Sequence, residues 1–182
     1  MSASDIKRLV RKFKNDIVDS SERLGMDTAL VKKDNIVEIV QFLKDDDKLA
    51  YNMLRHLTCV DYLHREPRFE VIYVLYSTTN KQQVVLKAMI NADDTTIDSI
   101  SHLYGSANWA EREVWDMYGI KFNHHPNMRR ILLYEEFEGH PLRKDYDKQT
   151  SQPRVQLLRQ ERDAFEEFKT YHVGESAEGS RS

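Results

Sequence analysis

The run "RFEVIYVLYSTTNKQQVVLKAMI", residues 68–90, constrains the fold of this chain more than any other stretch. Both halves are rich in valine, isoleucine and tyrosine, which favour strands, and "TTNK" between them is typical of a turn. Because side chains alternate between the two faces of a strand, one apolar set falls on a single face. That set is Val84, Leu86, Ala88 and Ile90. The run therefore predicts an antiparallel meander.

Helices and further strands are predicted before this meander. Apolar residues at helical spacing indicate a helix over 5–24, with Gly25 just beyond its end. "NIVEIV" at 35–40 is typical of a short strand, and 45–60 of a helix whose acidic start suits the helix dipole. "VDYL" at 60–63 would join the meander. We therefore expect an α+β fold: a small, mostly antiparallel sheet with helices packed on one side.

The first predicted helix carries many positive charges. Most of them lie away from its apolar stripe: Lys7, Arg8, Arg11, Lys12 and Lys14. Such a face is more often solvated than bound to an acidic partner, so we interpret it as solvated.

Two helices should follow the meander, over 95–105 and from Ser106 through Tyr118. Gly119 stands where a residue with positive φ ends a helix. Beyond Phe122 neither helical nor strand periodicity is visible for a long stretch. Loops of this length in a compact protein are usually functional or bound to something.

The predicted division of the chain is an α+β domain over 1–122 and an extended partner-docking segment over 123–182. Within the second region, 155–168 predicts a weakly amphipathic helix that would lean on a neighbour. The final "GESAEGSRS" is small and polar, and we expect it to be disordered.

Composition excludes several classes of function. A chain of 182 residues with 40% hydrophobic residues is long enough for one domain with a sizeable core. Its net charge of −3 comes from interleaved charges, which do not favour nucleic acid or an anionic membrane. The single cysteine, Cys59, rules out an internal disulfide and a self-contained iron–sulfur cluster. We find no secretory signal, no apolar run long enough to span a membrane and no glycine-rich phosphate loop.

The "ERE" motif suggests a general acid and base, Glu111 and Glu113. Residues two apart on a helix project about 200° apart around its axis, so these carboxylates should point to opposite sides. They could not share one substrate. The spacing instead favours an ion pair between Arg112 and Asp116 at i and i+4.

Metal, thiol and nucleic-acid chemistry are also weakly supported. Candidate metal ligands are His124, His125, His140, Glu135, Glu136 and Glu138. They form neither HxxxH nor HExxH, the helical spacings that zinc favours. Cys59 lies among apolar residues, as a buried inert thiol does. The basic pairs in "NMRR" and "LRKD" are flanked by acidic residues, unlike the basic stripe that nucleic acid requires. We therefore expect no catalytic residue, metal or cofactor on this chain.

The segment from Trp109 to Tyr146 combines charges, aromatic rings, prolines and glycines. Such a segment is suited to lie across another protein and to fix its register by ion pairs. We expect its charges to be neutralised by that partner.

These residues resemble the signature of the C subunit of bacterial NADH:quinone oxidoreductase, respiratory complex I. Its counterparts are the mitochondrial complex I iron–sulfur protein 3 and the J subunit of the chloroplast and cyanobacterial enzyme. The resemblance is strong over 105–146 and weaker, in element order, from about residue 30. It is carried by Glu111, Arg112, Glu113, Asp116, Gly119, Ile120, Phe122, His125, Pro126, Arg129, Arg130, Gly139, His140, Pro141, Leu142, Arg143, Lys144 and Asp145.

The resemblance implies a cofactor-free core subunit of the peripheral arm, packed against the larger D subunit beside which quinone is reduced. FMN and iron–sulfur clusters are then expected on partner subunits. Membrane contact would be made only through the complex, at the cytoplasmic face of the bacterial inner membrane. The Glu111 helix would anchor the segment, and the end from Gly139 to Asp145 would lie on the D subunit.

Two alternatives stay open. Related subunits occur in membrane-bound energy-converting hydrogenases and in ferredoxin-dependent quinone reductases, so the sequence does not identify the electron donor. The alternative from a different class is a stand-alone metal-dependent hydrolase that uses His124, His125 and His140. The chain departs from the family pattern at Asn127, where an acidic residue is common, and at Asp147, where proline is common.

Overall fold

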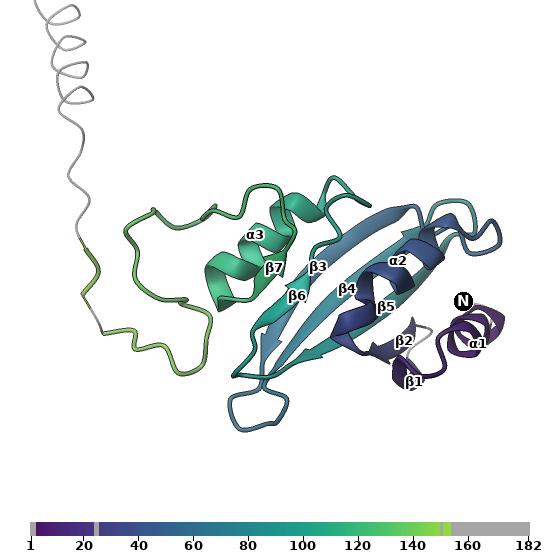
Figure 1. Cartoon of the computed structure of the whole chain (residues 1–182), viewed down its shortest axis with the longest axis horizontal. Helices are drawn as coiled ribbons and strands as arrows, with labels where there is room; N and C mark the ends of the chain where they lie inside the picture. Colours follow the sequence, from purple (N-terminus) through teal and green to yellow (C-terminus); the bar gives the residue numbers. More distant parts are fainter. Residues whose placement is uncertain (1–2, 24–25, 150, 154–182) are drawn as a thin grey trace, which may run out of the picture. The chain divides into compact units, whose positions relative to one another are not determined.

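The computed structural model describes residues 3–23, 26–149 and 151–153. The chain forms two compact units, Met1–Thr150 and Ser151–Ser182, and the described helices and strands all belong to the first. Its elements are α1 (Ala3–Lys12), β1 (Ile17–Arg23), β2 (Met26–Val31), η1 (Lys33–Asn35), α2 (Ile36–Asp45), β3 (Met53–Asp61), β4 (Phe69–Ser77), β5 (Gln82–Ile90), β6 (Thr96–Asp98), α3 (Ala107–Tyr118) and β7 (Lys121–Asn123) (Figure 1).

A five-stranded sheet in the order β1-β2-β5-β4-β3 forms the centre of this unit (Figure 1). β4 and β5 are antiparallel neighbours, with Phe69 opposite Ile90 and Leu75 opposite Val84. The β2–β5 pair is parallel, and the remaining neighbours are antiparallel. The predicted α+β fold with a mostly antiparallel sheet is therefore confirmed.

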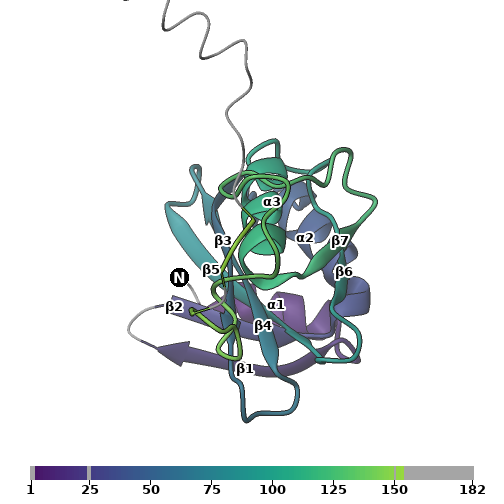
Figure 2. The same ribbon diagram turned by 90° about the vertical axis from the view of Figure 1, so that its left-hand side faces the viewer.

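The hydrophobic core lies on one face of the sheet. The apolar set predicted on β5 is 0 to 2% exposed. β4 and α2 add Phe69, Val71, Tyr73, Leu75, Ile36, Ile39, Val40 and Leu43. α2, α3 and the β6–β7 pair cover this face (Figure 2). Each aliphatic side chain that is fully buried contributes about 1.5–3 kcal/mol, so this single layer supplies most of the driving force for folding.

The predicted helix over 5–24 is wrong in its second half. α1 ends at Lys12, and the following turn is closed by Asp16 and Ile17, whose N–H groups donate to the Phe13 carbonyl. Residues 17–23 then pair with β2. The stretch "IVDSSER" begins with β-branched residues and continues with serines, and both residue types favour a helix only weakly. Pairing with β2 supplies hydrogen-bond partners for its backbone N–H and C=O groups. Gly25 lies outside the described residues.

The predictions for 35–40 and 45–60 are wrong, because helix and strand are exchanged. Residues 36–45 form α2, since the apolar spacing of "NIVEIV" continues into a helical repeat. A run that short does not distinguish a strand from a buried helix. Residues 53–61 form β3, because pairing with β4 buries alternate residues: Leu57, Cys59 and Asp61.

The predicted helix over 95–105 is also wrong. β6 is a short strand in which Ile97 lies opposite Phe122 of the parallel β7. Ile100 and Tyr104 are buried as expected, but they lie in the irregular connection between β6 and α3. A strand of three residues carries too little alternation to be recognised beside apolar residues at helical spacing.

α3 agrees with the prediction for 106–118. It begins at Ala107 and ends at Tyr118, and Gly119 has a φ of 75° in the left-handed region. From His124 to the end of the described residues there is no helix or strand. The predicted helix at 155–168 and the expected disorder lie outside the described residues. Within the described ranges, no helix combines the length and apolar character of a membrane span.

The buried hydroxyl of Tyr104 bonds the main chain just before β3. Tyr104 Oη donates a hydrogen bond to the Tyr51 carbonyl at 2.6 Å. Tyr104→Phe should lower the free energy of unfolding by about 1–2 kcal/mol, because the buried carbonyl loses this donor. Tyr73 is the matched control, since its buried hydroxyl has no hydrogen-bond partner among the described residues. Urea denaturation should show no loss for Tyr73→Phe, and equal losses in both variants would contradict the expectation.

Candidate functional site

Asp116 on α3 is a buried carboxylate that holds the loop after β7. Its Oδ2 accepts three backbone N–H bonds: Ile131 at 3.1 Å, Leu132 at 2.9 Å and Leu133 at 3.0 Å. Its Oδ1 accepts a bond from Arg130 Nη1 at 2.6 Å. Burial alone raises the pKa of Asp116, but these donors outweigh it and hold the pKa below its ordinary value. The carboxylate therefore stays ionised and fixes residues 130–133.

Two arginines of the signature bind backbone carbonyls of the same loop. Arg130 Nη2 donates to the Phe137 carbonyl at 2.6 Å and to the Gly139 carbonyl at 3.2 Å. Arg112 donates to the carbonyls of Arg129 at 3.1 Å and Arg130 at 3.0 Å. The predicted Arg112–Asp116 ion pair is therefore wrong. Helical spacing allowed that pair. In the fold, however, Arg112 supplies donors to loop carbonyls and Asp116 accepts from loop N–H groups, because these backbone groups need partners.

The end of α3 is capped by residues 140–143. His140 Nδ1 bonds the Asp116 carbonyl at 2.9 Å, and Leu142 N donates to the Met117 carbonyl at 3.1 Å. Arg143 Nε donates to the Tyr118 carbonyl at 2.5 Å. The last carbonyls of a helix have no partner within it, and a cation suits its negative end. The segment "HPLR" is therefore the C-terminal cap of α3.

Gly119 makes this cap possible. A Cβ at this position would lie 2.6 Å from His140 Cδ2 and 2.8 Å from Arg143 Nη2. Its φ of 75° is also one that L side chains rarely adopt. Burial lowers the pKa of His140, so the ring is held neutral in this position.

A second network ties the end of the loop to the sheet. Arg68 binds both carboxylate oxygens of Asp61 at 2.8 Å and also binds Asp145 Oδ2 at 2.7 Å. Lys144 N donates to Asp61 Oδ2 at 2.8 Å. The hydrogen bonds of Arg68 lower the pKa of Asp61 despite its burial. Sequence reasoning missed Asp61 and Arg68, and an acidic residue in the run "CVDYL" was the only available signal.

Glu111 and Glu113 diverge on α3 as predicted. Glu111 is 0% exposed and accepts bonds from Ser99 Oγ at 2.6 Å and Ile100 N at 2.8 Å, whereas Glu113 is exposed. Burial raises the pKa of Glu111 to about 7. His125 Nε2 lies 4.0 Å from Glu111 Oε2 and bonds the Asn108 carbonyl at 3.1 Å. Glu111 therefore fixes the β6–α3 connection.

The three histidines considered as metal ligands do not converge. His125 and His140 each bond a different carbonyl of α3, and His124 is exposed. Among the described residues, no group of three or more histidine, cysteine, aspartate or glutamate side chains could hold a metal ion. Cys59 is buried as predicted, though on a strand, and burial raises its pKa to about 12.

The expectation that a partner neutralises the charges of this segment is wrong for several of them. Arg130, Arg143 and Asp145 are all bound within the chain. Of the remaining signature residues, Pro126, Arg129, Leu142 and Lys144 are exposed side chains on the same loop. Gly139 has a φ of 89°, and Tyr146 lies against it.

Exposed apolar side chains gather beside the ordered loop. Trp109 and Leu132 are both 62% exposed. They line a hollow of about 250 Å³ between α3, β3 and the loop, which we call the Trp109 hollow. Its other lining residues are Leu54, Arg55, His56, Leu57, Ser106, Ala110, Glu113 and Ile131.

The fold and the site define an α+β protein in which one helix orders a long, charged loop. Residues 29–152 match the family described as respiratory-chain NADH dehydrogenase, 30 Kd subunit. The C subunit of the NADH-quinone oxidoreductase of Citrifermentans bemidjiense is 47% identical over 141 residues, which cover 78% of this chain and 86% of that protein. The corresponding C subunit of Geobacter sulfurreducens is 47% identical over 140 residues, with 76% and 85% covered.

Two solved structures share the fold of this chain. A trypsin-resistant fragment (1-134) of Nqo5 has a TM-score of 0.61 at 26% identity and covers 70% of this chain and 99% of that one. A chain of an archaeal membrane-bound sulfane sulfur reductase shares the fold, with a TM-score of 0.68 at 18% identity, covering 98% of this chain and 95% of that one. The chain belongs to the family of the 30 kDa subunit of respiratory-chain NADH dehydrogenase, and it is a subunit of an NADH-quinone oxidoreductase.

Asp116→Asn should detach the loop from α3. The substitution removes the charge that Arg130 pairs with and turns one acceptor into a donor, so the free energy of unfolding should fall by about 3–5 kcal/mol. Glu113→Gln on the exposed side of the same helix is the control and should change it by less than about 0.5 kcal/mol. Urea denaturation measures both, and limited proteolysis within 123–150 should accelerate only for Asp116→Asn. Similar behaviour of the two variants would contradict the assigned role.

Glu111→Gln should remove a pH dependence of stability. An unfolded glutamate ionises near its ordinary pKa of about 4.3, whereas folded Glu111 keeps its proton up to about pH 7. The native protein therefore loses stability between these pH values as pH rises. The difference in free energy of unfolding, variant minus native, should increase by about 2–3 kcal/mol from pH 5 to 8. Denaturation at several pH values tests this, and a constant difference would refute it.

Proposed function

We propose that this chain is a cofactor-free core subunit of the peripheral arm of a proton-translocating NADH:quinone oxidoreductase. In this role it packs against the D subunit near the quinone site and supports electron transfer from NADH to quinone. Family membership supports the complex. The single observation that supports a docking role is the Trp109 hollow, in which two large apolar side chains stand exposed beside a rigidly held loop.

The Trp109 hollow has the composition of a protein-binding site. Tryptophan is the residue type most enriched at the energetic centres of interfaces, where it fills a pocket of the partner. Trp109 stacks near Arg112, whose guanidinium carbon lies 5.3 Å from the indole centroid and which also binds the loop. This contact restricts the exposed ring before a partner binds, which lowers the entropy lost on binding.

The ion pairs of the signature contribute to docking by preorganisation. Because Arg130, Arg143 and Asp145 are bound within the chain, they hold the loop in shape. The side chains left to contact the partner are then the apolar ones of the hollow and the exposed charges of Arg129 and Lys144 on the same loop. Rim charges mainly affect the association rate and the choice of partner.

The chain's own residues favour cofactors on partner subunits. Cys59 is the one thiol in the sequence, and burial holds it in its protonated form. A cluster normally takes about four thiolates, so we propose that FMN and iron–sulfur clusters reside on neighbouring peripheral-arm subunits. Attachment to the cytoplasmic face of the bacterial inner membrane would be made through the complex.

An equivalent subunit of a ferredoxin-dependent quinone reductase or an energy-converting hydrogenase is the alternative. The fold occurs in a chain of an archaeal respiratory membrane complex, at 18% identity. The relatives at 47% identity are named for NADH-quinone oxidoreductase, which favours NADH as the donor. NADH oxidation by the purified complex would separate the two.

The docking role is tested by co-purification from membranes in mild detergent, with a tagged chain replacing the native copy. Trp109→Ser combined with Leu132→Ser should reduce the recovered D subunit at least about tenfold, because these two side chains supply the apolar centre of the contact. Recovery is measured by mass spectrometry of the eluate.

Val18→Ser is the matched control, since Val18 on β1 is also 62% exposed and lies outside the Trp109 hollow. It should leave recovery unchanged. Full recovery with the double variant would reject the hollow as the dock. Normal recovery with lost turnover would indicate a catalytic part, and a native chain that brings down no cluster-bearing complex would reject the proposed function.

A further inference from the structure

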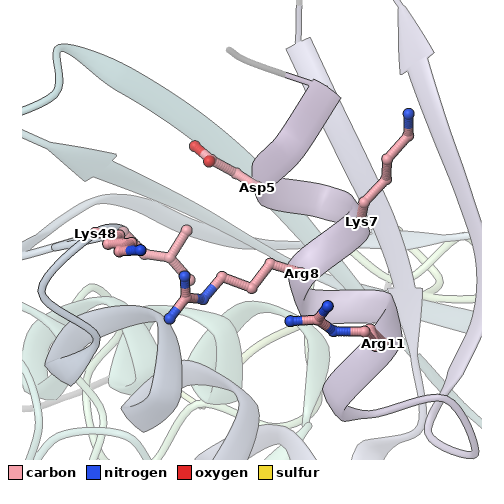
Figure 3. Close-up of a pocket in the computed structure, with 6 residues that line it drawn as sticks. Asp5, Lys7, Arg8, Arg11 and Lys48 are labelled. Carbon is pink, nitrogen blue, oxygen red and sulfur yellow. The ribbon is translucent and has the colours of Figure 1, made fainter.

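A second hollow lies between α1 and the turn that follows α2, far in sequence from the signature (Figure 3). Its volume is about 630 Å³. Four of its six lining residues are cationic, and we call it the basic hollow: Asp5, Lys7, Arg8, Arg11, Lys48 and Leu49. The docking role proposed above makes no use of it.

Asp46 builds this hollow by joining its two walls. Its Oδ2 accepts a bond from Arg8 Nη2 at 2.7 Å, and its Oδ1 accepts one from Lys48 N at 3.0 Å. The turn is closed by Leu49 N, which donates to the Asp46 carbonyl at 2.9 Å. Asn80 Nδ2, just beyond the end of β4, donates to the Lys48 carbonyl at 2.8 Å. The backbone that carries Lys48 is therefore fixed beside Arg8.

Figure 3 shows how the cations are directed. Arg8 and Arg11, one helical turn apart on α1, extend toward Lys48, whereas Lys7 extends away. Arg11 and Lys48 form no ion pair among the described residues. Like charges brought together in this way repel each other, and an anion between them would relieve that repulsion.

Charge balance indicates what kind of anion fits. Lys7 extends away and Asp46 pairs with Arg8, so Arg11 and Lys48 are the two cations facing the hollow that form no ion pair with a described carboxylate. Asp5 is the one carboxylate among the lining residues. A phosphate monoester carries about −1.5 to −2 at neutral pH, whereas a single carboxylate carries less. Guanidinium forks bind phosphate oxygens through paired N–H bonds, and a lysine adds a point charge.

We propose that the basic hollow binds a phosphate group through Arg8, Arg11 and Lys48. The group belongs either to a free phosphate-bearing small molecule or to a lipid headgroup, since both present the same oxygens. The hollow, of about 630 Å³, is bounded by α1 on one side and by the turn at Lys48 and Leu49 on the other, so it suits a compact anion. The interpretation of this helix face as solvated is wrong for Arg8, which pairs with Asp46, whereas Arg11 is exposed as expected.

Isothermal titration of the full-length chain with inorganic phosphate tests this, with sodium chloride at equal ionic strength as the blank. Saturable binding is expected for the native chain, and Arg11→Gln combined with Lys48→Gln should weaken it at least about tenfold. The matched control is Lys81→Gln combined with Lys121→Gln, which removes two exposed lysines outside the hollow and should leave the affinity unchanged. Circular dichroism confirms that both double variants are folded.

Co-sedimentation with phosphatidylcholine vesicles, with and without phosphatidic acid, distinguishes the two sources. Binding that needs phosphatidic acid and is lost in Arg11→Gln/Lys48→Gln supports the proposal and assigns the lipid headgroup. Phosphate binding without vesicle binding supports it and assigns a free ligand. Absence of phosphate binding, equal weakening by the control, or binding of polyglutamate in place of phosphate would each overturn it, the last in favour of an acidic protein segment.

Discussion

The carboxylate of Asp116 is the contact on which the organisation of the loop depends. A buried carboxylate is costly unless nearly every lone pair has a donor. Three successive backbone N–H groups and Arg130 meet that requirement, so the loop is shaped around the charge. The carbonyl of the same residue binds His140. Both ends of the 130–140 stretch are therefore attached to one position of α3, which is why an irregular segment can have a defined structure.

The other signature residues extend this attachment along α3 and onto the sheet. Gly119 leaves room for the cap at the helix end. Asp61 on β3 and Arg68, which directly precedes β4, bind the last part of the loop. A family signature is often interpreted as a set of contact residues for a partner. In this chain most of its charged groups have partners inside the chain, and the exposed tryptophan and leucine beside them remain available for a neighbouring subunit.

Sequence reasoning succeeded where a pattern was long and had one period. The meander of β4 and β5 and the helix ending at Gly119 were predicted on that basis, and the divergence of Glu111 and Glu113 followed from helix geometry alone. It failed where a short apolar run fits two periods, as at "NIVEIV", or where a neighbouring strand overrode the local preference, as in β1 and β3. The predicted Arg112–Asp116 ion pair was wrong for a related reason. The i,i+4 spacing considers only partners on the same helix, whereas both side chains bind the loop.

By itself, the sequence determined the strongly periodic elements, the family and the scarcity of thiols. Only the tertiary structure decided which group each charged side chain meets. Lys144 and Asp61 are 83 residues apart in the chain. Arg130 and Asp116 are 14 residues apart, separated by the end of α3, β7 and the start of the irregular loop. Such contacts cannot be predicted from a repeating pattern in the sequence. They form because buried backbone and side-chain groups need hydrogen-bond partners, and the fold decides which partners lie close enough.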